Sequence, residues 1–253
     1  ENLNVTPFSE YLFTAYVKKA TPASGVKITV GSFELQTSAS QPANEWFKVE
    51  KRIATLNDTA IAVAFTVNGT ANIDGVSIVP AKDMGTEQKT YLSDIAWKEY
   101  NNLPYCDDDT TGSGKISLGT MATFDKGIFT HPLPAEPVYV TYDLTGRNYT
   151  SFRSFVGYNN SSRPDTAQTQ FFVYVDGKLA AESPVLVMNK AYWFDVDITG
   201  ASELKIMQSD GGDGYAFDGA CWADAALYTA LSEEGNVVLE SPSDIDLSNL
   251  VYI

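Results

Sequence analysis

Apolar and polar residues alternate along much of the first 80 positions, with the period of two that is typical of half-buried β-strands. Clusters such as TPASG (21–25) and TSASQPAN (37–44) separate the alternating stretches, and residues of these types favour chain reversal. This part of the chain is therefore expected to be all-β. The alternation predicts strands at 11–18, 26–35, 46–53, 60–67 and 73–79.

The last of these stretches, IDGVSIVP (73–80), resembles the closing strand of many carbohydrate-binding jelly rolls. Such sandwiches usually need about eight strands, and a smaller set leaves an open edge and a half-covered apolar face. We therefore expect residues 1–80 to form a partial jelly-roll module that lacks strands upstream of residue 1. A complete small sandwich is the alternative.

Residues 81–90 fall in a polar, turn-rich stretch with few side chains that could anchor a core, so we expect a linker there. Alternation resumes beyond it and predicts a second β-sandwich over 91–231, with a long loop at 101–114. Residues 232–253 are acidic and polar, and we expect them to form a C-terminal tail or linker. The alternative is that they dock back onto the domain as an edge strand. The strands predicted in the second domain are 138–144, 150–156, 170–175, 185–187, 193–197, 203–209 and 223–231.

Length and charge narrow the function classes. A chain of 253 residues suits two domains. The net charge of -15 argues against binding to nucleic acid or to anionic membrane surfaces, which would repel it, whereas neutral glycans are indifferent to it. No apolar run approaches the roughly 18 residues of a membrane span, so membrane insertion is not expected.

No catalytic motif emerges from the sequence. His131 is the single histidine, and no Gly-x-Ser-x-Gly elbow accompanies it. Phosphate-binding loops, dinucleotide fingerprints and zinc spacings are also missing. We expect a non-catalytic chain, and an enzyme whose site leaves no sequence motif is the rival interpretation.

Six short motifs follow one another over a little more than half of the chain. In order and spacing they resemble family 51 of the carbohydrate-binding modules, so the resemblance implies an all-β, galactose-binding-like sandwich. The motifs are YLSDIAW (91–97), KGIFTHP (126–132), YDLTG (142–146), VGYNN (156–160), FFVYVDGK (171–178) and DGGDGYAFDGACWADAALY (210–228).

The resemblance also implies a function. It suggests the non-catalytic region of a larger, secreted or cell-surface, bacterial glycoside hydrolase, attached to an upstream catalytic or β-sandwich domain. The expected partners are mucin or blood-group glycans with terminal galactose or N-acetylgalactosamine. The alternative is a pair of architectural modules that pack beside a catalytic domain without binding sugar.

A sugar site needs an aromatic surface and a few fixed polar groups. The family phrase Lys-Gly-Leu-Gly-Val-His-Ala matches KGIFTHP, so the resemblance gives His131 a ligand role, with a structural histidine as the alternative. Arg153 could fork two hydrogen bonds to vicinal hydroxyls or be a plain surface arginine. We expect Trp97 and Trp222 to fill the sandwich. The remaining expected ligand residues are Tyr158, Asn159, Asn160 and Asp218, with Tyr105 and Phe217 for stacking.

This chain departs from the family in three places. The opening loop reads NLPYCDDD (102–109), where relatives tend to carry Gly-Trp-Gly-Pro. Amides occupy the loop after Gly157, where relatives carry acidic residues. The second histidine of the family phrase Asp-His-Ala-Asp-Trp is replaced in Asp218-Gly219-Ala220-Cys221-Trp222. The sugar preference of a relative therefore does not transfer automatically.

Two further features follow from the resemblance. Calcium is a frequent structural ion in galactose-binding-like sandwiches, and loop carboxylates would hold it. Cys106 and Cys221 would lie near each other, as a disulfide or as two buried thiols. The candidate calcium ligands are Asp107, Asp108, Asp109, Asp213 and Asp218.

Overall fold

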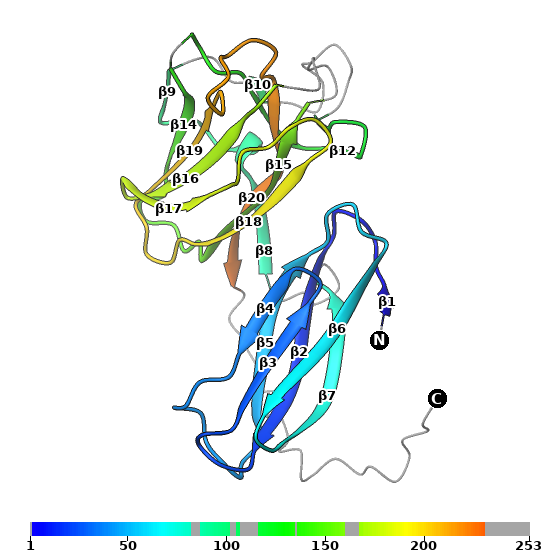
Figure 1. Ribbon diagram of the computed structural model, residues 1–253. Helices are drawn as coiled ribbons and strands as arrows, with labels where there is room; N and C mark the ends of the chain where they lie inside the picture. Colours follow the sequence, from blue (N-terminus) through cyan, green and yellow to red (C-terminus); the bar gives the residue numbers. More distant parts are fainter. Residues whose placement is uncertain are drawn as a thin grey trace. The chain divides into compact units, whose positions relative to one another are not determined.

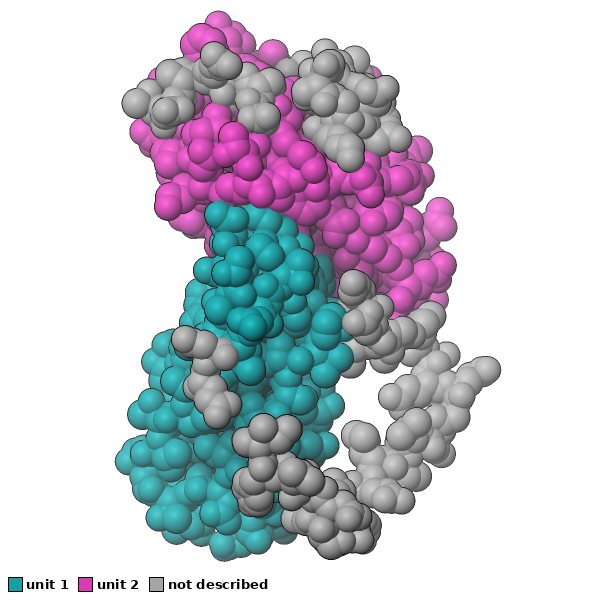
Figure 2. All heavy atoms as spheres, turned by 90° about the vertical axis from the view of Figure 1, so that its right-hand side faces the viewer, with its two compact units in different colours: residues 1–86, 232–253 teal, residues 87–231 magenta. Residues whose placement is uncertain are grey.

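The computed structural model describes residues 2–81, 87–101, 105–106, 116–134, 136–159 and 167–230. These residues form two compact units, one within 1–86 and one within 87–231 (Figure 2). Apart from the short 3₁₀ turn η2 (Leu92–Asp94), the regular structure in the described ranges is β-strand, and the named strands pair antiparallel. The predicted all-β sandwich class is confirmed. In those ranges no helix is long and apolar enough to span a bilayer.

Unit 1 is a sandwich of two sheets, with the strand orders β1-β6-β3-β4 and β5-β2-β7 (Figure 1). Strand β2 illustrates what holds the sandwich together. Every second residue from Tyr11 to Val17 is buried between the two sheets. These residues pack against Val26, Ile28 and Val30 of the facing sheet. The strands are β1 (Asn2–Asn4), β2 (Glu10–Lys19), β3 (Gly25–Val30), β4 (Phe33–Gln36), β5 (Phe47–Ala54), β6 (Ala60–Asn68) and β7 (Ala71–Pro80).

Two details of unit 1 differ from the prediction. The stretch 26–35 is a hairpin, in which β3 turns into β4 at Gly31, whose φ of +57° favours glycine. Strand β1, too short to show an alternation, was not predicted.

Unit 2 packs one sheet of order β10-β13-β20-β15-β18 against a second of order β17-β16-β19-β14-β9. Strand β8 pairs with the distal half of β20, and β11 and β12 form a hairpin. The strands are β8 (Glu87–Tyr91), β9 (Glu99–Tyr100), β10 (Tyr105–Cys106), β11 (Ile116–Leu118), β12 (Ala122–Phe124), β13 (Gly127–Thr130), β14 (Val138–Asp143), β15 (Ser151–Tyr158), β16 (Gln170–Val175), β17 (Lys178–Glu182), β18 (Ala191–Asp197), β19 (Glu203–Ser209) and β20 (Ala220–Ala230).

The core of unit 2 is built around Trp222 on the central strand β20. Its ring is fully buried and contacts Phe171 edge-on, with centroids 5.1 Å apart, and stacks on Phe194 at 5.7 Å. Trp222 therefore fills the sandwich, as expected, and Trp97 packs against the same core.

Three predicted segments differ from the structure. The expected linker 81–90 ends in strand β8, because residues from Glu87 onward pair with β20. The stretch 185–187 makes a single bridge, from Leu186 to Thr169, instead of a strand. The expected loop 101–114 contains the two-residue strand β10.

Candidate functional site

Three segments that are distant in sequence meet at one end of the β10-β13-β20-β15-β18 sheet. Strands β13 and β15 flank β20, and Thr130 and Tyr158 both lie opposite Ala220. His131 directly follows β13, Asn159 directly follows β15, and the 210–219 loop leads into β20. The structure therefore brings together residues from three of the six motifs.

Gln208, a residue that was not predicted, connects these segments. Its buried side chain accepts a hydrogen bond from Thr130 Oγ1 at 2.6 Å. Its amide nitrogen donates to Thr169 Oγ1 at 2.9 Å and to the carbonyl of Asp218 at 2.7 Å. The side chain thereby ties the residue before His131 to the loop that carries Phe217. The available sequence signal was a polar residue in the inward series Leu204, Ile206, Gln208 of β19.

Tyr158 and Asp218 form a buried pair beneath this end of the sheet. The Tyr158 hydroxyl donates to Asp218 Oδ1 at 3.0 Å, and both residues are at most 1% exposed. Oδ2 of Asp218 has no hydrogen-bond partner among the described residues. Burial, reinforced by the carboxylates of Asp213 and Asp210, raises the pKa of Asp218 to about 7, although the Tyr158 hydrogen bond opposes the shift. Burial likewise raises the pKa of Tyr158.

Phe217 and Tyr215 are the exposed aromatic residues of the 210–219 loop, at 59% and 43% exposure. Phe217 has a φ of +70°, which is unusual for a bulky side chain and has a cost on the order of 1 kcal/mol or more. Gly211, Gly212 and Gly214 also have positive φ. This curled loop places an aromatic ring in solvent immediately before the buried Asp218.

His131 is half-buried and follows Thr130, which lies opposite Ala220 at the end of this loop. Its Nδ1 lies 2.9 Å from the carbonyl oxygen of Pro132, and because a carbonyl can only accept, Nδ1 carries the hydrogen in that contact. The imidazole is therefore oriented by the backbone carbonyl of the next residue, Pro132.

Arg153 and Asn159 are both buried. The expectation that Arg153 faces solvent is wrong: it is 3% exposed and donates two hydrogen bonds to Glu87, at 2.8 and 2.5 Å. A third, at 3.3 Å, reaches Asp195. Its guanidinium lies 3.9 Å from the ring centroid of Tyr228. The Asn159 amide donates to Cys221 Sγ at 3.3 Å. These contacts assign both residues to structural clusters, and we leave them out of the sugar-contacting surface.

Of the two alternatives for Cys106 and Cys221, the structure favours thiols over a disulfide. Cys221 is a free, buried thiol, and burial raises its pKa to about 11. Cys106 lies opposite Ile128 of β13, whereas Cys221 lies opposite Phe129 on the other side of β13. Two strand spacings of about 4.8 Å separate the two Cα atoms, and a disulfide needs about 4.4–6.8 Å.

The other predicted residues divide into two groups. The backbone of Tyr105 pairs with that of Phe129, which brings it to the same sheet. Asn160, Asp107, Asp108 and Asp109 lie outside the described residues. Asp213 is exposed and accepts a hydrogen bond from the Gln168 backbone at 3.1 Å. Within the described ranges, His, Cys, Asp and Glu side chains form no group of three or more that could hold a metal ion, and we assign no role to calcium.

Comparison with known proteins places unit 2 in a family. Residues 88–228 match the NPCBM/NEW2 domain. A curated relative, the blood-group-substance endo-1,4-beta-galactosidase of Clostridium perfringens, is 29% identical over 42% of this chain. The chain spans 15% of that relative's length.

Two solved structures of Clostridium perfringens proteins are also similar. CBM51 from GH95 in complex with methyl-galactose is 28% identical, with a TM-score of 0.50 over 55% of this chain and 99% of that one. CBM51-2 with GlcNAc and the INT domains of ZmpB is 26% identical, with a TM-score of 0.52 over 68% of this chain and 38% of that one. The family and fold are of the carbohydrate-binding type, that is, non-catalytic accessory domains. This chain belongs to the NPCBM/NEW2 domain family.

Proposed function

We propose that unit 2 binds glycans with terminal galactose or N-acetylgalactosamine at the surface formed by His131, Tyr215 and Phe217. The observation that carries the proposal is the exposed Phe217 ring on a loop that Gln208 ties to Thr130, the residue before His131. Apolar faces of pyranose rings pack on aromatic side chains, and a few fixed polar groups select the hydroxyls.

Each residue has a distinct part in this proposal. Phe217 and Tyr215 supply the stacking surface, because they are the exposed aromatic residues of the loop. His131 accepts a hydrogen bond from an axial hydroxyl at Nε2, since its Nδ1 donates to the Pro132 carbonyl. Gln208 and the Tyr158–Asp218 pair touch no sugar, and they hold the loop and the histidine in place.

The solved relatives with methyl-galactose and with GlcNAc support sugar binding of this kind. We further propose that the parent protein is a secreted or surface-bound bacterial glycoside hydrolase, which this chain holds against galactose-containing glycans such as mucin or blood-group chains. The curated endo-galactosidase relative supports that class of parent.

Calorimetric titration of the full chain with mammalian glycans, competed by galactose and N-acetylgalactosamine, tests the proposal. We expect dissociation constants from millimolar to tens of micromolar, roughly -4 to -6 kcal/mol. Phe217→Ala is expected to weaken binding about tenfold, and His131→Ala to abolish selection for galactose. Leu179→Ala, an exposed apolar position on β17, is the matched control. Folded protein that binds none of the panel would favour the architectural role.

A further inference from the structure

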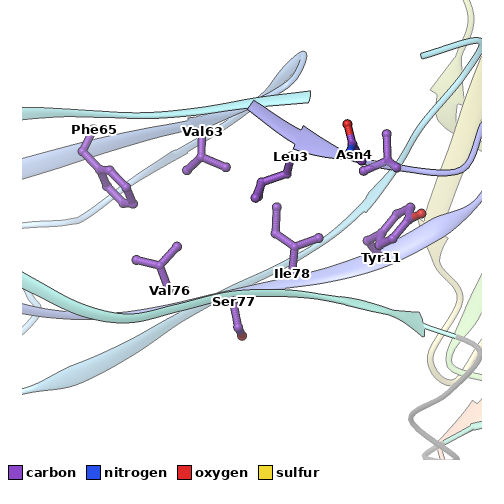
Figure 3. A pocket seen from close by; sticks show the side chains of 9 residues that line it. Leu3, Asn4, Tyr11, Val63, Phe65, Val76, Ser77 and Ile78 are labelled. Atoms are coloured by element: carbon purple, nitrogen blue, oxygen red, sulfur yellow. The ribbon is translucent and has the colours of Figure 1, made fainter. Parts of the chain in front are cut away.

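Unit 1 has an apolar cleft at one open side of its sandwich. The cleft has a volume of about 550 Å³ and lies between the edges of the two sheets. Figure 3 shows Val63 and Leu3 pointing across it toward Ile78, whereas Ser77 points away. Water-exposed apolar surface of this extent is unfavourable and commonly marks a binding surface. The lining residues are Leu3, Asn4, Val5, Tyr11, Val63, Phe65, Val76, Ser77 and Ile78.

The strands on both sides of the cleft have open edges. Among the described residues, β6 pairs with β1 over Ala60–Ala62, but from Val63 to Asn68 it pairs with β3 alone. Strand β7 ends the order β5-β2-β7 and pairs with β2 alone. Such edges expose backbone groups that readily accept another strand.

The register of β1 indicates how the open edge of β6 could be filled. Asn2, Leu3 and Asn4 lie antiparallel to Ala62, Ile61 and Ala60. Extending this ladder in the N-terminal direction leads past Ala64, Phe65, Thr66 and Val67 in turn. A strand that continues β1 in the N-terminal direction would therefore run along the unpaired edge of β6.

We propose that this side of unit 1 takes one more β-strand, supplied by the same polypeptide as residues that continue β1 in the N-terminal direction. The strand pairs with β6 over Ala64–Val67 and places apolar side chains opposite Phe65 and Val67. Those side chains fill the cleft against Val76 and Ile78. Main-chain pairing with pockets for alternate side chains is the general mode of strand addition.

The phase of the added strand is fixed by Leu3. Leu3 and its partner Ile61 face the interior, as do Val63 and Phe65 on the same side of β6. Because directly opposed residues share a face, residues opposite Phe65 and Val67 face the cleft, and those opposite Ala64 and Thr66 face solvent. The residue directly before Glu1 therefore faces outward.

The length of the relatives supports this source. The chain spans 15% of the curated galactosidase, so much polypeptide of such proteins lies outside a region like this one. A second copy of the chain and a small apolar ligand are the competing occupants. The proposal does not depend on sugar binding by unit 2.

Two N-terminal extensions of equal composition test the proposal on the full chain. Val-Thr-Val-Thr-Val-Thr before Glu1 places its valines opposite Phe65 and Val67, and Thr-Val-Thr-Val-Thr-Val reverses the phase. We expect the first extension to raise the melting temperature of unit 1. Backbone amide hydrogens on the open edge of β6 should exchange with solvent at least roughly tenfold more slowly than in the unextended chain. Phe65→Glu should remove both gains, whereas Thr66→Glu on the outer face should not.

Equal effects of the two extensions, or no effect of either, would overturn the proposal. Sedimentation of the unextended chain adds a second criterion. A dimer that Phe65→Glu dissociates would assign the cleft to a second copy and contradict the proposal. A monomer that gains stability only with the in-phase extension supports it.

Discussion

The Tyr158 hydroxyl donates a hydrogen bond to Oδ1 of Asp218 at 3.0 Å in a fully buried environment. The pair joins the end of β15 to the residue that follows the exposed Phe217. A buried carboxyl with one unpaired oxygen is costly when ionised. The stability of this junction therefore depends on pH.

Asp218 is predicted to make the protein less stable as pH rises. Its pKa is about 7 in the folded state, against 3.8 as the ordinary value, so the folded protein retains a proton that the unfolded chain releases. Protonated Asp218 contributes on the order of 4 kcal/mol to the free energy of unfolding. This stabilisation is fully present below about pH 4 and is lost as the pH rises through about 7.

Asp218→Asn should flatten that dependence, because the amide stays neutral. Urea unfolding at pH 5 and pH 8 measures the change in unfolding free energy, with the exposed Asp125→Asn as control. An Asp218→Asn variant that keeps the full pH slope would contradict the assignment.

Gln208→Leu is predicted to lower both stability and sugar affinity. Removing the amide leaves Thr130 and the Asp218 carbonyl without their buried partner, at about 1–3 kcal/mol for each unsatisfied group. Hydrogen exchange of residues 210–219 should accelerate, and affinity for galactose should fall even where the protein is fully folded. Met207→Leu, on the outer face of the same strand, is the control. Unchanged exchange in this loop would show that Gln208 does not position it.

Arg153→Met is predicted to destabilise unit 2 without changing sugar affinity. Removing one partner of a buried ion pair costs about 3–5 kcal/mol, and Glu87 and Asp195 would both lose their cation. Thermal unfolding measures the loss, and titration with galactose below the transition measures the affinity. A stable variant that no longer binds galactose would restore Arg153 to the sugar site.

Cys221 is predicted to be reduced in the folded protein. Iodoacetamide should not modify it under native conditions, since burial raises the pKa of the thiol to about 11. It should react fully after unfolding in guanidinium without any reductant. Labelling that requires prior reduction would contradict the free thiol.

The sequence predicted the long strands well, because alternation over many residues has one clear interpretation. Strands β16 (Gln170–Val175) and β19 (Glu203–Ser209) have the predicted bounds. Short strands such as β1 and β10 could not be predicted, since two or three residues show no period and depend on partners distant in the chain.

The segments that form the candidate site could be predicted, but not the burial of their side chains. His131 and Phe217 were identified from motifs, and the structure brings their segments together. Arg153, Asn159 and Asp218 were expected to contact the ligand, yet each is buried with polar partners in the protein. Such burial depends on which strands pair, and no local pattern reveals it.

Backbone chemical shifts of the full chain, titrated with methyl galactoside, test the central claim most directly. The account predicts perturbations at His131 and across 215–220 that saturate at millimolar sugar, and their loss in Phe217→Ala. Perturbations confined to other surfaces, or none at saturating sugar in the folded protein, would contradict the proposed binding site.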